Sequence, residues 1–271
     1  MAYFLHRAHS LLLYATRASM APGSPAGGAP ASAGPADPAL IEDLVAANRI
    51  LADQGVVDGY GHVSVRHPKN PERYFLSRSL APELVTAADI MEYDLDSNPV
   101  DQRGRAMYLE RFIHGEIYKA RPEINAVVHS HSPAVVPFGV SNVPLRPLYH
   151  MSGFLSEGVP LFEIRDAGGM TDLLVRNPEL GRALAQSLAD KPVALMRGHG
   201  NVVVGSTIPL VVYRAVYTEV NARLQVQAIM LGGSVTYLEP EEGRLAAANV
   251  AATIGRPWEL WKRKALAREK P

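Results

Sequence analysis

The stretch that most constrains the fold is an apolar run that ends in two histidines. Ala126, Val127 and Val128 are typical of a buried strand, and two histidines follow, His129 directly and His131 two residues later. Because side chains on a strand alternate between its two faces, the two histidines point to the same side. Neutral imidazole is a good ligand for divalent metal ions. The pair is therefore either part of a metal site or a polar cap at the end of the strand.

A third histidine lies between two glycines at another strand boundary. The apolar residues 193–196 and 202–204 flank Gly198-His199-Gly200, which indicates a sharp turn between two strands. Glycine allows the backbone to approach a ligand closely or to take a positive φ. We therefore add His199 to the candidate metal ligands.

A carboxylate completes this candidate set. Glu110 begins the segment 108–118, which has helical periodicity. An acidic residue at a helix start is either a charge favoured by the helix dipole or a group that faces a metal ion. Three histidines and one carboxylate suit zinc, manganese or iron, whereas magnesium and calcium prefer shells of oxygen atoms.

Composition excludes several other kinds of site and partner. The chain has 271 residues, of which 47% are hydrophobic, enough for one sizeable α/β domain. It has no cysteine, so thiolate metal sites and cysteine nucleophiles are excluded. The formal net charge of +0 gives no electrostatic reason to expect a nucleic acid or an anionic membrane as partner. No apolar run approaches the ~20 residues that span a bilayer.

The first 37 residues differ from the rest of the chain. Residues 21–38 are nearly all Ala, Pro, Gly and Ser, a composition that cannot bury a core. The apolar patch at 11–15 is short for a secretory signal. We predict that residues 1–37 are a disordered extension, or that the first methionine is an upstream start and Met20 is the true beginning. We also predict that the protein is cytoplasmic.

Periodicity predicts the elements of the remaining chain. A main domain is expected at 38–243, and a C-terminal helix and tail at 244–271 carry Trp258 and Trp261, which anchor either a subunit contact or a small core cluster. Ile164 to Gly169 is expected to be a polar loop. Helices are predicted from Pro38, at 108–120, 177–188 and 208–230, and strands at 63–65, 74–76, 90–94, 126–131, 193–196 and 202–204.

Four motifs, taken together, resemble the class II aldolase/adducin family. They are Gly61-His62-Val63-Ser64-Val65-Arg66, Leu109-Glu110-Arg111, Ala126-Val127-Val128-His129-Ser130-His131 and Arg197-Gly198-His199-Gly200, and the resemblance covers roughly residues 40–240. It implies an α/β/α sandwich with a central, mostly antiparallel sheet, often in a homotetramer with sites at subunit boundaries. It also implies one divalent metal per subunit, zinc or manganese, held by His129, His131 and His199. Glu110 matches the family's acidic residue, a metal ligand or catalytic base.

The departures from the family pattern concern the substrate. Sugar-phosphate aldolases of this family have two serines just before the acidic residue, where this chain has Tyr108 and Leu109. Leu80 stands where a phosphate-binding loop ends in glycine, and His62 replaces an asparagine. A tyrosine that donates a proton in the aldolases aligns with His150, beside Tyr149. We read these changes as a site that kept its metal and changed its substrate.

The loop Ser77-Arg78-Ser79 offers a group for a carboxylate. The Arg78 guanidinium can bind a carboxylate through two nitrogens, unless it is simply a solvated surface arginine. His62 either protonates the substrate, as His150 can, or satisfies a loop backbone. Within the family, this set looks most like the decarboxylases of hydroxylated aromatic or pyridine dicarboxylates.

The resemblance thus implies a metal-dependent carbon–carbon lyase, a carboxy-lyase or aldehyde-lyase, acting on a small carboxylate. The expected activity is decarboxylation, in which Glu110 is a fourth metal ligand or a proton carrier and Tyr149 lies beside the substrate. Two alternatives stay open: an aldolase or epimerase acting on a sugar phosphate or 2-keto acid, and a non-catalytic scaffold like the adducin branch.

Overall fold

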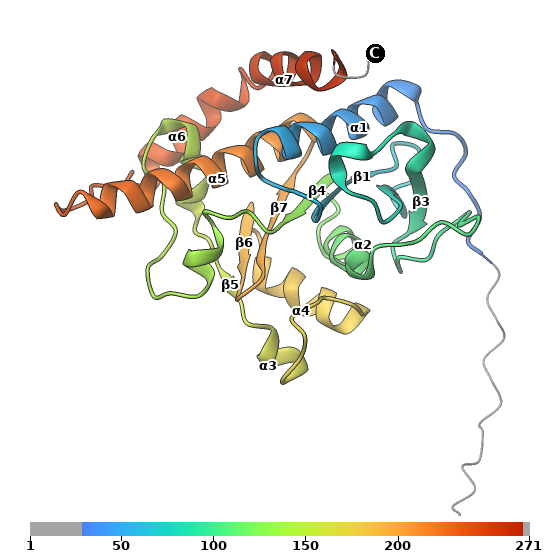
Figure 1. The fold of residues 1–271 in the computed structure, drawn as a ribbon, viewed down its shortest axis with the longest axis horizontal. Coiled ribbons are helices and arrows are strands. Elements are labelled where there is room, and N and C mark those ends of the chain that lie inside the picture. Colours follow the sequence, from blue (N-terminus) through green and yellow to red (C-terminus); the bar gives the residue numbers. More distant parts are fainter. Residues whose placement is uncertain (1–28, 268–271) are drawn as a thin grey trace, which may run out of the picture.

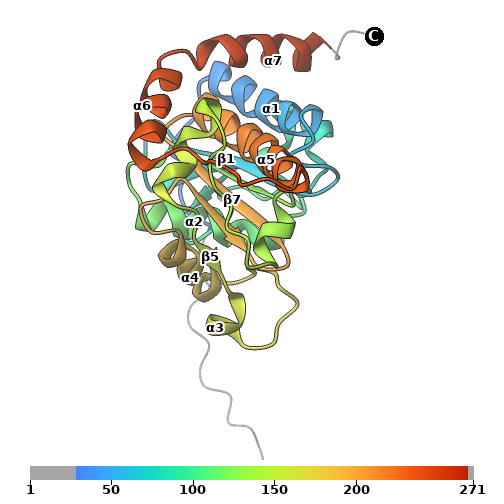
Figure 2. The same ribbon diagram turned by 90° about the vertical axis from the view of Figure 1, so that its left-hand side faces the viewer.

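The computed structural model describes residues 29–267, which form a three-layer α/β/α sandwich. Figure 1 shows helices α1 (Pro38–Asp53), α5 (Ile208–Met230) and α7 (Gly255–Ala267) above the central sheet. Helices α2 (Phe112–Ala120), α3 (Ile164–Gly168) and α4 (Pro178–Leu188) lie below it, and Figure 2 shows the same layering from the side.

The described sheet has seven strands in the order β3-β2-β1-β4-β7-β6-β5. Neighbouring strands are antiparallel except β5 and β6, which are parallel, so the predicted mostly antiparallel sandwich is confirmed. The strands are β1 (His62–Arg66), β2 (Arg73–Ser77), β3 (Ile90–Asp94), β4 (Ala126–Ser130), β5 (Leu161–Phe162), β6 (Val193–Met196) and β7 (Gly200–Gly205).

Alternation along each strand builds two separate cores. In β4, Ala126 and Val128 pack into the core beneath α1 and α5, while Val127 packs into the core against α2 and α4. In β1, Val63 and Val65 likewise belong to the first core. The alternate residues of β1, His62 and Ser64, therefore face the α2 layer together with His129 of β4.

The segment 164–169, predicted as a loop, contains the short helix α3. The Glu163 side chain accepts a hydrogen bond from the Arg165 backbone nitrogen and caps the helix start. The loop prediction was wrong because this single turn is too short to show helical periodicity and is defined by its cap.

The C-terminal part is continuous with the sandwich. Helix α6 (Pro240–Ala251) packs against the 3-10 helix η5 (His150–Glu157), so the expected boundary at residue 243 falls inside a helix. Trp258 is buried and Trp261 packs on the same core, beside α1 and α5. The two tryptophans were expected in a subunit contact or in a core cluster, and in the described chain they pack in the core.

Residues 29–37 form an extended strap across β2 and β3. The Ala33 backbone nitrogen and the Ser32 hydroxyl donate to the Glu92 carboxylate at 2.8 and 2.6 Å, and Arg73 donates to the Ala31 carbonyl. This part of the predicted extension is thus held on the domain, whereas residues 1–28, including Met20 and the apolar patch, lie outside the described residues. No described helix is long and apolar enough to cross a membrane.

Candidate metal centre

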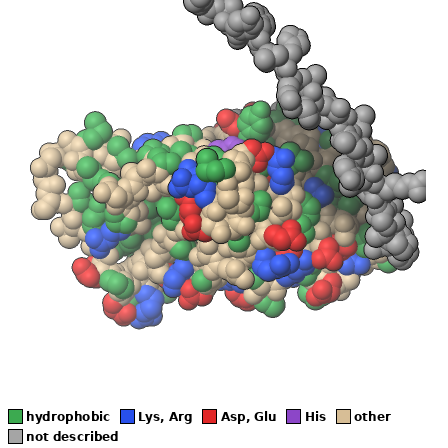
Figure 3. Space-filling model, turned by 90° about the horizontal axis from the view of Figure 1, so that it is seen from below, with side chains coloured by type: hydrophobic (Ala, Val, Ile, Leu, Met, Phe, Trp, Pro, Cys, Tyr) green, Lys and Arg blue, Asp and Glu red, His purple; other side chains and the backbone are tan. Residues whose placement is uncertain are grey.

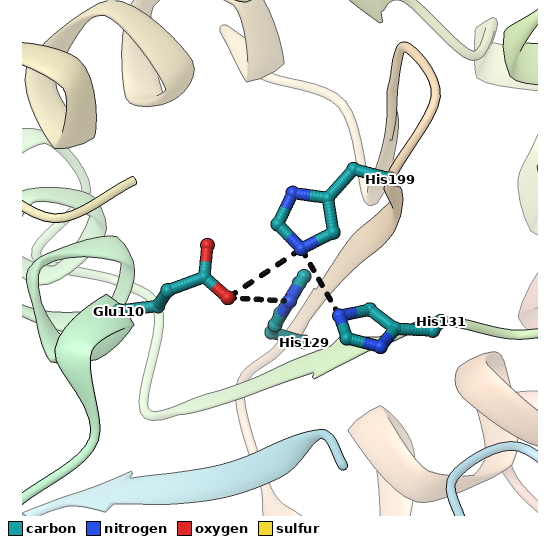
Figure 4. A group of neighbouring side chains, drawn as sticks. All are labelled: Glu110, His129, His131 and His199. Atoms are coloured by element: carbon teal, nitrogen blue, oxygen red, sulfur yellow. Dashed lines mark hydrogen bonds and ion pairs between the residues drawn. The ribbon is translucent and has the colours of Figure 1, made fainter. Parts of the chain in front are cut away.

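Four side chains that are distant in sequence converge at one end of the sheet. Figure 4 shows Glu110, from the 3-10 helix η3 (Leu109–Arg111), facing His129, His131 and His199. The Glu110 Oε2 atom lies 3.4 Å from Nε2 of both His129 and His199, and the Nε2 atoms of His199 and His131 are 3.0 Å apart. One ligand atom from each of the four residues lies within 4.8 Å of the others.

Two glycines explain how His199 reaches this cluster. Gly198 has a φ of 64°, in the left-handed region that favours glycine. At Gly200, a Cβ atom would collide with the carbonyl oxygen of Ser130, because β7 passes very close to the end of β4. The sequence Gly-His-Gly thus produces both the tight turn and the close approach of the two strands.

In two of the candidate ligands, His129 and His199, a backbone carbonyl determines which ring nitrogen carries the proton. His129 Nδ1 lies 3.1 Å from the Asn201 carbonyl, and His199 Nδ1 lies 2.9 Å from the Leu173 carbonyl. A carbonyl can only accept, so Nδ1 of each neutral ring carries its proton and Nε2 presents a lone pair. Such second contacts commonly orient metal-binding histidines.

The donor chemistry of the cluster fits a divalent cation. Nε2 of His129 is buried and has no hydrogen-bond partner in the described part of the chain. Two imidazole lone pairs and a carboxylate oxygen thus face one another, and the fourth group, His131, contributes at most one proton. A divalent cation bound between them would satisfy all of these acceptors.

Electrostatics keep the groups in metal-binding forms. Burial alone would raise the pKa of Glu110, but the neighbouring His129 and His199 hold it well below its usual range. The Val175 backbone nitrogen donates to Glu110 Oε1 at 2.9 Å and directs Oε2 toward the histidines. Burial, followed by the neighbouring His129 and His199, lowers the pKa of His131 to about 4.

His62 lies beside the cluster and is part of a buried layer. Its ring centroid is 5.1 Å from that of His129 and 4.5 Å from that of Tyr108. Its Nδ1 is 2.6 Å from Nε2 of His114, a residue that sequence reasoning did not select. Burial, then His114 and His129, lowers the pKa of His62 well below its ordinary value.

The predicted carboxylate-binding loop follows the end of β2. The Ser77 hydroxyl lies 3.3 Å from the Tyr108 hydroxyl, which itself donates to the Leu80 carbonyl at 2.6 Å. The Arg78 Nε donates to Asp89 at 2.6 Å, so one edge of the guanidinium is bound and the side chain is held in place. Asp89 was not singled out in the sequence.

Tyr149 and His150 are not brought to the cluster within one chain. Their rings contact each other, with centroids 5.8 Å apart, and neither contacts a candidate ligand in the described part of the chain. His150 lines a cavity of about 480 Å³ beside Tyr213 and Tyr217 of α5. These two candidates therefore occupy a separate region of the described chain.

Helix α5 ties this region to the cluster through buried polar side chains. Glu219 accepts hydrogen bonds from the Ser132 hydroxyl at 2.5 Å and the Ala134 backbone nitrogen at 3.0 Å, immediately after His131. Asn221 accepts from the Leu148 backbone nitrogen and the Ser152 hydroxyl. The sequence offered one signal for these residues: polar side chains interrupt an otherwise apolar helical stripe.

The cluster is partly open to solvent, and the face of the molecule drawn in Figure 3 has mixed charge. Figure 3 shows a small area of histidine at the surface, among basic, acidic and hydrophobic side chains. His131 and His199 are half-buried, whereas Glu110 and His129 are buried. A ligand can therefore reach the cluster from the side of the two half-buried rings.

A sandwich with three histidines and a glutamate at one end of an antiparallel sheet defines a protein of the class II aldolase type. The chain belongs to the family described as Class II Aldolase and Adducin N-terminal domain, whose model matches residues 42–226. The family predicted from the four sequence motifs is thereby confirmed.

Similar proteins include enzymes of two activities. The chain is 38% identical over 247 residues to the decarboxylase tropJ of Talaromyces stipitatus, covering 83% of this chain and 93% of that protein. It is 32% identical over 209 residues to a 3,4-dihydroxyphthalate decarboxylase of Arthrobacter keyseri, covering 72% and 80%. Among solved structures, an L-fuculose 1-phosphate aldolase from Glaciozyma antarctica has a TM-score of 0.69 at 25% identity, covering 83% of this chain and 88% of that one.

Proposed function

We propose that this protein is a metal-dependent decarboxylase of a small hydroxylated aromatic or pyridine carboxylate. The similarity to two decarboxylases over most of the chain supports the reaction class. Metal dependence is supported by one observation: Glu110 Oε2 lies close to Nε2 of His129 and of His199, and both of these nitrogens present lone pairs because the ring protons are on Nδ1.

The metal we propose is one zinc or manganese ion per subunit, held by His129, His131, His199 and Glu110. Such an ion supplies Lewis-acid stabilisation of the negative charge that develops on the oxygens of the substrate. In the alternative role of Glu110, its carboxylate moves a proton and leaves the ligation to the three histidines.

In the proposed reaction, the bond between the ring carbon and the carboxylate carbon breaks and carbon dioxide leaves. The electron pair of that bond remains on the ring carbon, beside a carbon that bears a hydroxyl oxygen. A proton then forms the new C–H bond. His62 and His150 are the two alternative imidazoles from which this proton could come, with Tyr149 beside the second.

The loop after β2 is proposed to bind the carboxylate that stays on the substrate. Asp89 holds Arg78 through Nε, and the terminal nitrogens of Arg78 have no hydrogen-bond partner in the described part of the chain. A bidentate pair with a substrate carboxylate uses those nitrogens. Ser77 and Ser79 are proposed to add hydroxyl donors.

Tyr149 and His150 serve this reaction only if they come from another copy. We therefore propose a homo-oligomer, most simply a homotetramer, in which these residues approach the cluster of a neighbouring subunit. Their separation from the cluster within one chain supports this arrangement.

An aldolase acting on a sugar phosphate is the second candidate, favoured by the similarity to an L-fuculose 1-phosphate aldolase. The residues before Glu110 argue against phosphate. The Tyr108 hydroxyl is already engaged by the Leu80 carbonyl, and Leu109 presents an exposed apolar side chain. The third possibility, a scaffold without activity, is disfavoured because all four ligand positions are filled and converge.

The test combines metal analysis with a substrate screen. The purified protein, reconstituted with zinc or manganese, is expected to release carbon dioxide from hydroxylated aromatic dicarboxylates and to leave sugar phosphates and 2-keto acids intact. His129→Ala is expected to lose both the bound metal and the activity. Full turnover by a metal-free variant would end the lyase proposal, and cleavage of a sugar phosphate would favour the aldolase.

A further inference from the structure

A chain of four polar side chains runs through the core between β1 and α2. His62 Nδ1 is 2.6 Å from His114 Nε2, His114 Nδ1 is 2.6 Å from the Ser64 hydroxyl, and that hydroxyl is 2.7 Å from the Tyr118 hydroxyl. All four residues are buried, with at most 4% of their surface exposed. Buried polar groups are costly unless bonded, so the direction of every bond in this chain matters.

The spacing of these residues explains how the chain forms. His62 and Ser64 are two apart on a strand and therefore point to one face. His114 and Tyr118 are four apart on α2 and therefore lie on one side of the helix. Two polar rows thus meet beside the apolar cluster of this layer.

The Tyr118 end determines the direction of the bonds. The phenol has one proton, and its only other acceptor in the described part of the chain is the Asn125 carbonyl at 3.5 Å, beyond good hydrogen-bond range. The phenol therefore donates to Ser64. The single proton of Ser64 then goes to His114 Nδ1, so a neutral His114 carries its own proton on Nε2.

The last step concerns His62. His114 donates from Nε2, so Nδ1 of His62 accepts and the proton of a neutral His62 is on Nε2. Within the described part of the chain, the hydrogen bond of the His62 ring is the one at Nδ1, so Nε2 is left for another partner. The ring contacts those of Tyr108 and His129. An N–H donor is thus presented beside the candidate metal centre.

We propose that His114, Ser64 and Tyr118 are positioning residues that hold His62 as its Nε2–H tautomer, so that His62 donates a hydrogen bond to a substrate oxygen. The role toward substrate rests on the proposed decarboxylase function, whereas the tautomer does not. A neutral ring whose Nδ1 is occupied cannot release its remaining proton without becoming an anion. His62 is then a fixed donor, and the proton of the new C–H bond comes from His150 or water.

The tautomer is tested by ¹⁵N nuclear magnetic resonance on the metal-free protein with labelled histidine. Two other histidines of the protein serve as internal references, one for each tautomer. His67 accepts at Nδ1 from the Lys69 backbone nitrogen and donates from Nε2 to the Gly34 carbonyl, whereas His199 donates from Nδ1. We expect His62 and His114 to show the chemical shifts of the His67 type. Shifts of the His199 type at either residue would overturn the proposal.

A variant tests whether His114 is responsible. In His114→Leu, Nδ1 of His62 loses its donor, the ring exchanges between tautomers, and its two ¹⁵N signals are expected to move toward each other. Tyr74→Phe is the matched control, because it removes a buried hydroxyl from the same core. That hydroxyl bonds to Ser97 and to none of the four side chains His62, His114, Ser64 and Tyr118. Its His62 signals are expected to match those of the unaltered protein. Unmoved His62 signals in His114→Leu would remove His114 from the proposed role.

Kinetics separate a fixed donor from an acid. The glutamine of His62→Gln keeps an N–H donor but cannot act as an acid, so this variant is expected to retain at least tenfold more kcat/KM than His62→Leu at equal metal content. Equal losses in the two variants would refute the donor role. If the unaltered protein decarboxylates no substrate, the proposed function fails while the resonance experiment still decides the tautomer.

Discussion

Replacing Glu219 should weaken metal binding from a position that touches no metal ligand. Glu219 is 3% exposed, and its Oε2 atom accepts from both the Ser132 hydroxyl and the Ala134 nitrogen, which form the turn directly after His131. In Glu219→Ala both donors lose their acceptor, at about 1–3 kcal/mol each. Since the hydroxyl can rotate to another acceptor, we expect a loss of roughly 2–4 kcal/mol in the free energy of unfolding. Loosening the turn should also lower zinc affinity by about 10–100-fold.

The matched variant is Glu219→Gln, whose amide oxygen can take the place of Oε2 and accept from the same two donors. Its unfolding free energy and zinc affinity should stay close to those of the unaltered protein. Arg223→Ala removes the exposed partner of Glu219 and should cost about 0–1 kcal/mol. The measurements are urea unfolding of the metal-free protein and zinc titration by calorimetry. Equal losses in Glu219→Ala and Glu219→Gln would show that charge, and not the held turn, is what matters.

Four further outcomes test the site and the fold. Zinc at about 100 times its Kd should stabilise the protein by about 2.7 kcal/mol in calorimetric melting but leave His129→Ala unchanged, and an equal shift in both would place the metal elsewhere. Arg78→Ala should raise KM for a dicarboxylate by roughly 10–100-fold with little change in kcat, since a charged hydrogen bond is lost, and an unchanged KM in steady-state assays would remove Arg78 from the site. Gly200→Ala should lower the free energy of unfolding by at least about 3 kcal/mol, because the new Cβ atom meets the backbone of β4. Gly59→Ala, where the space is open, should lower it by less than about 1 kcal/mol. Similar losses in urea unfolding of the two variants would contradict the close approach of β7 to β4. Burial lowers the pKa of His114 to about 3 from 6.5, so the unfolded chain binds a proton here more readily than the folded protein, and the free energy of unfolding decreases as pH falls from 6.5 toward 3. In His114→Gln, urea unfolding should show a smaller decrease over this pH range. The same decrease in both proteins would contradict the lowered pKa.

The four candidate ligands could be selected from the sequence because each lies in a local motif. His129 and His131 end an apolar strand, His199 lies between glycines, and Glu110 begins a helical segment. Helix α5 was predicted at 208–230 and has those bounds, since a long apolar stripe is a strong periodic signal.

The contacts that hold the site could not be predicted in the same way. His114 meets His62 across 52 residues and Glu219 meets Ser132 across 87, and no local pattern encodes such pairs. Asp89 is only 11 residues from Arg78, but their pairing depends on how β2 and β3 align. Tyr149 and His150 were selected from the motif, but the described chain keeps them apart from the cluster, and only the proposed oligomer would bring them to it.

The strap of residues 29–37 bears on where this protein can be shortened. It bonds to Glu92 of β3 and lines a cavity together with Phe75 and Ile90. A recombinant version that starts at the first helix, Pro38, would leave that apolar surface in water at the open edge of the sheet, where strands of other molecules can pair. Purification tags and truncations are therefore better placed before residue 29 than at the first residue of α1.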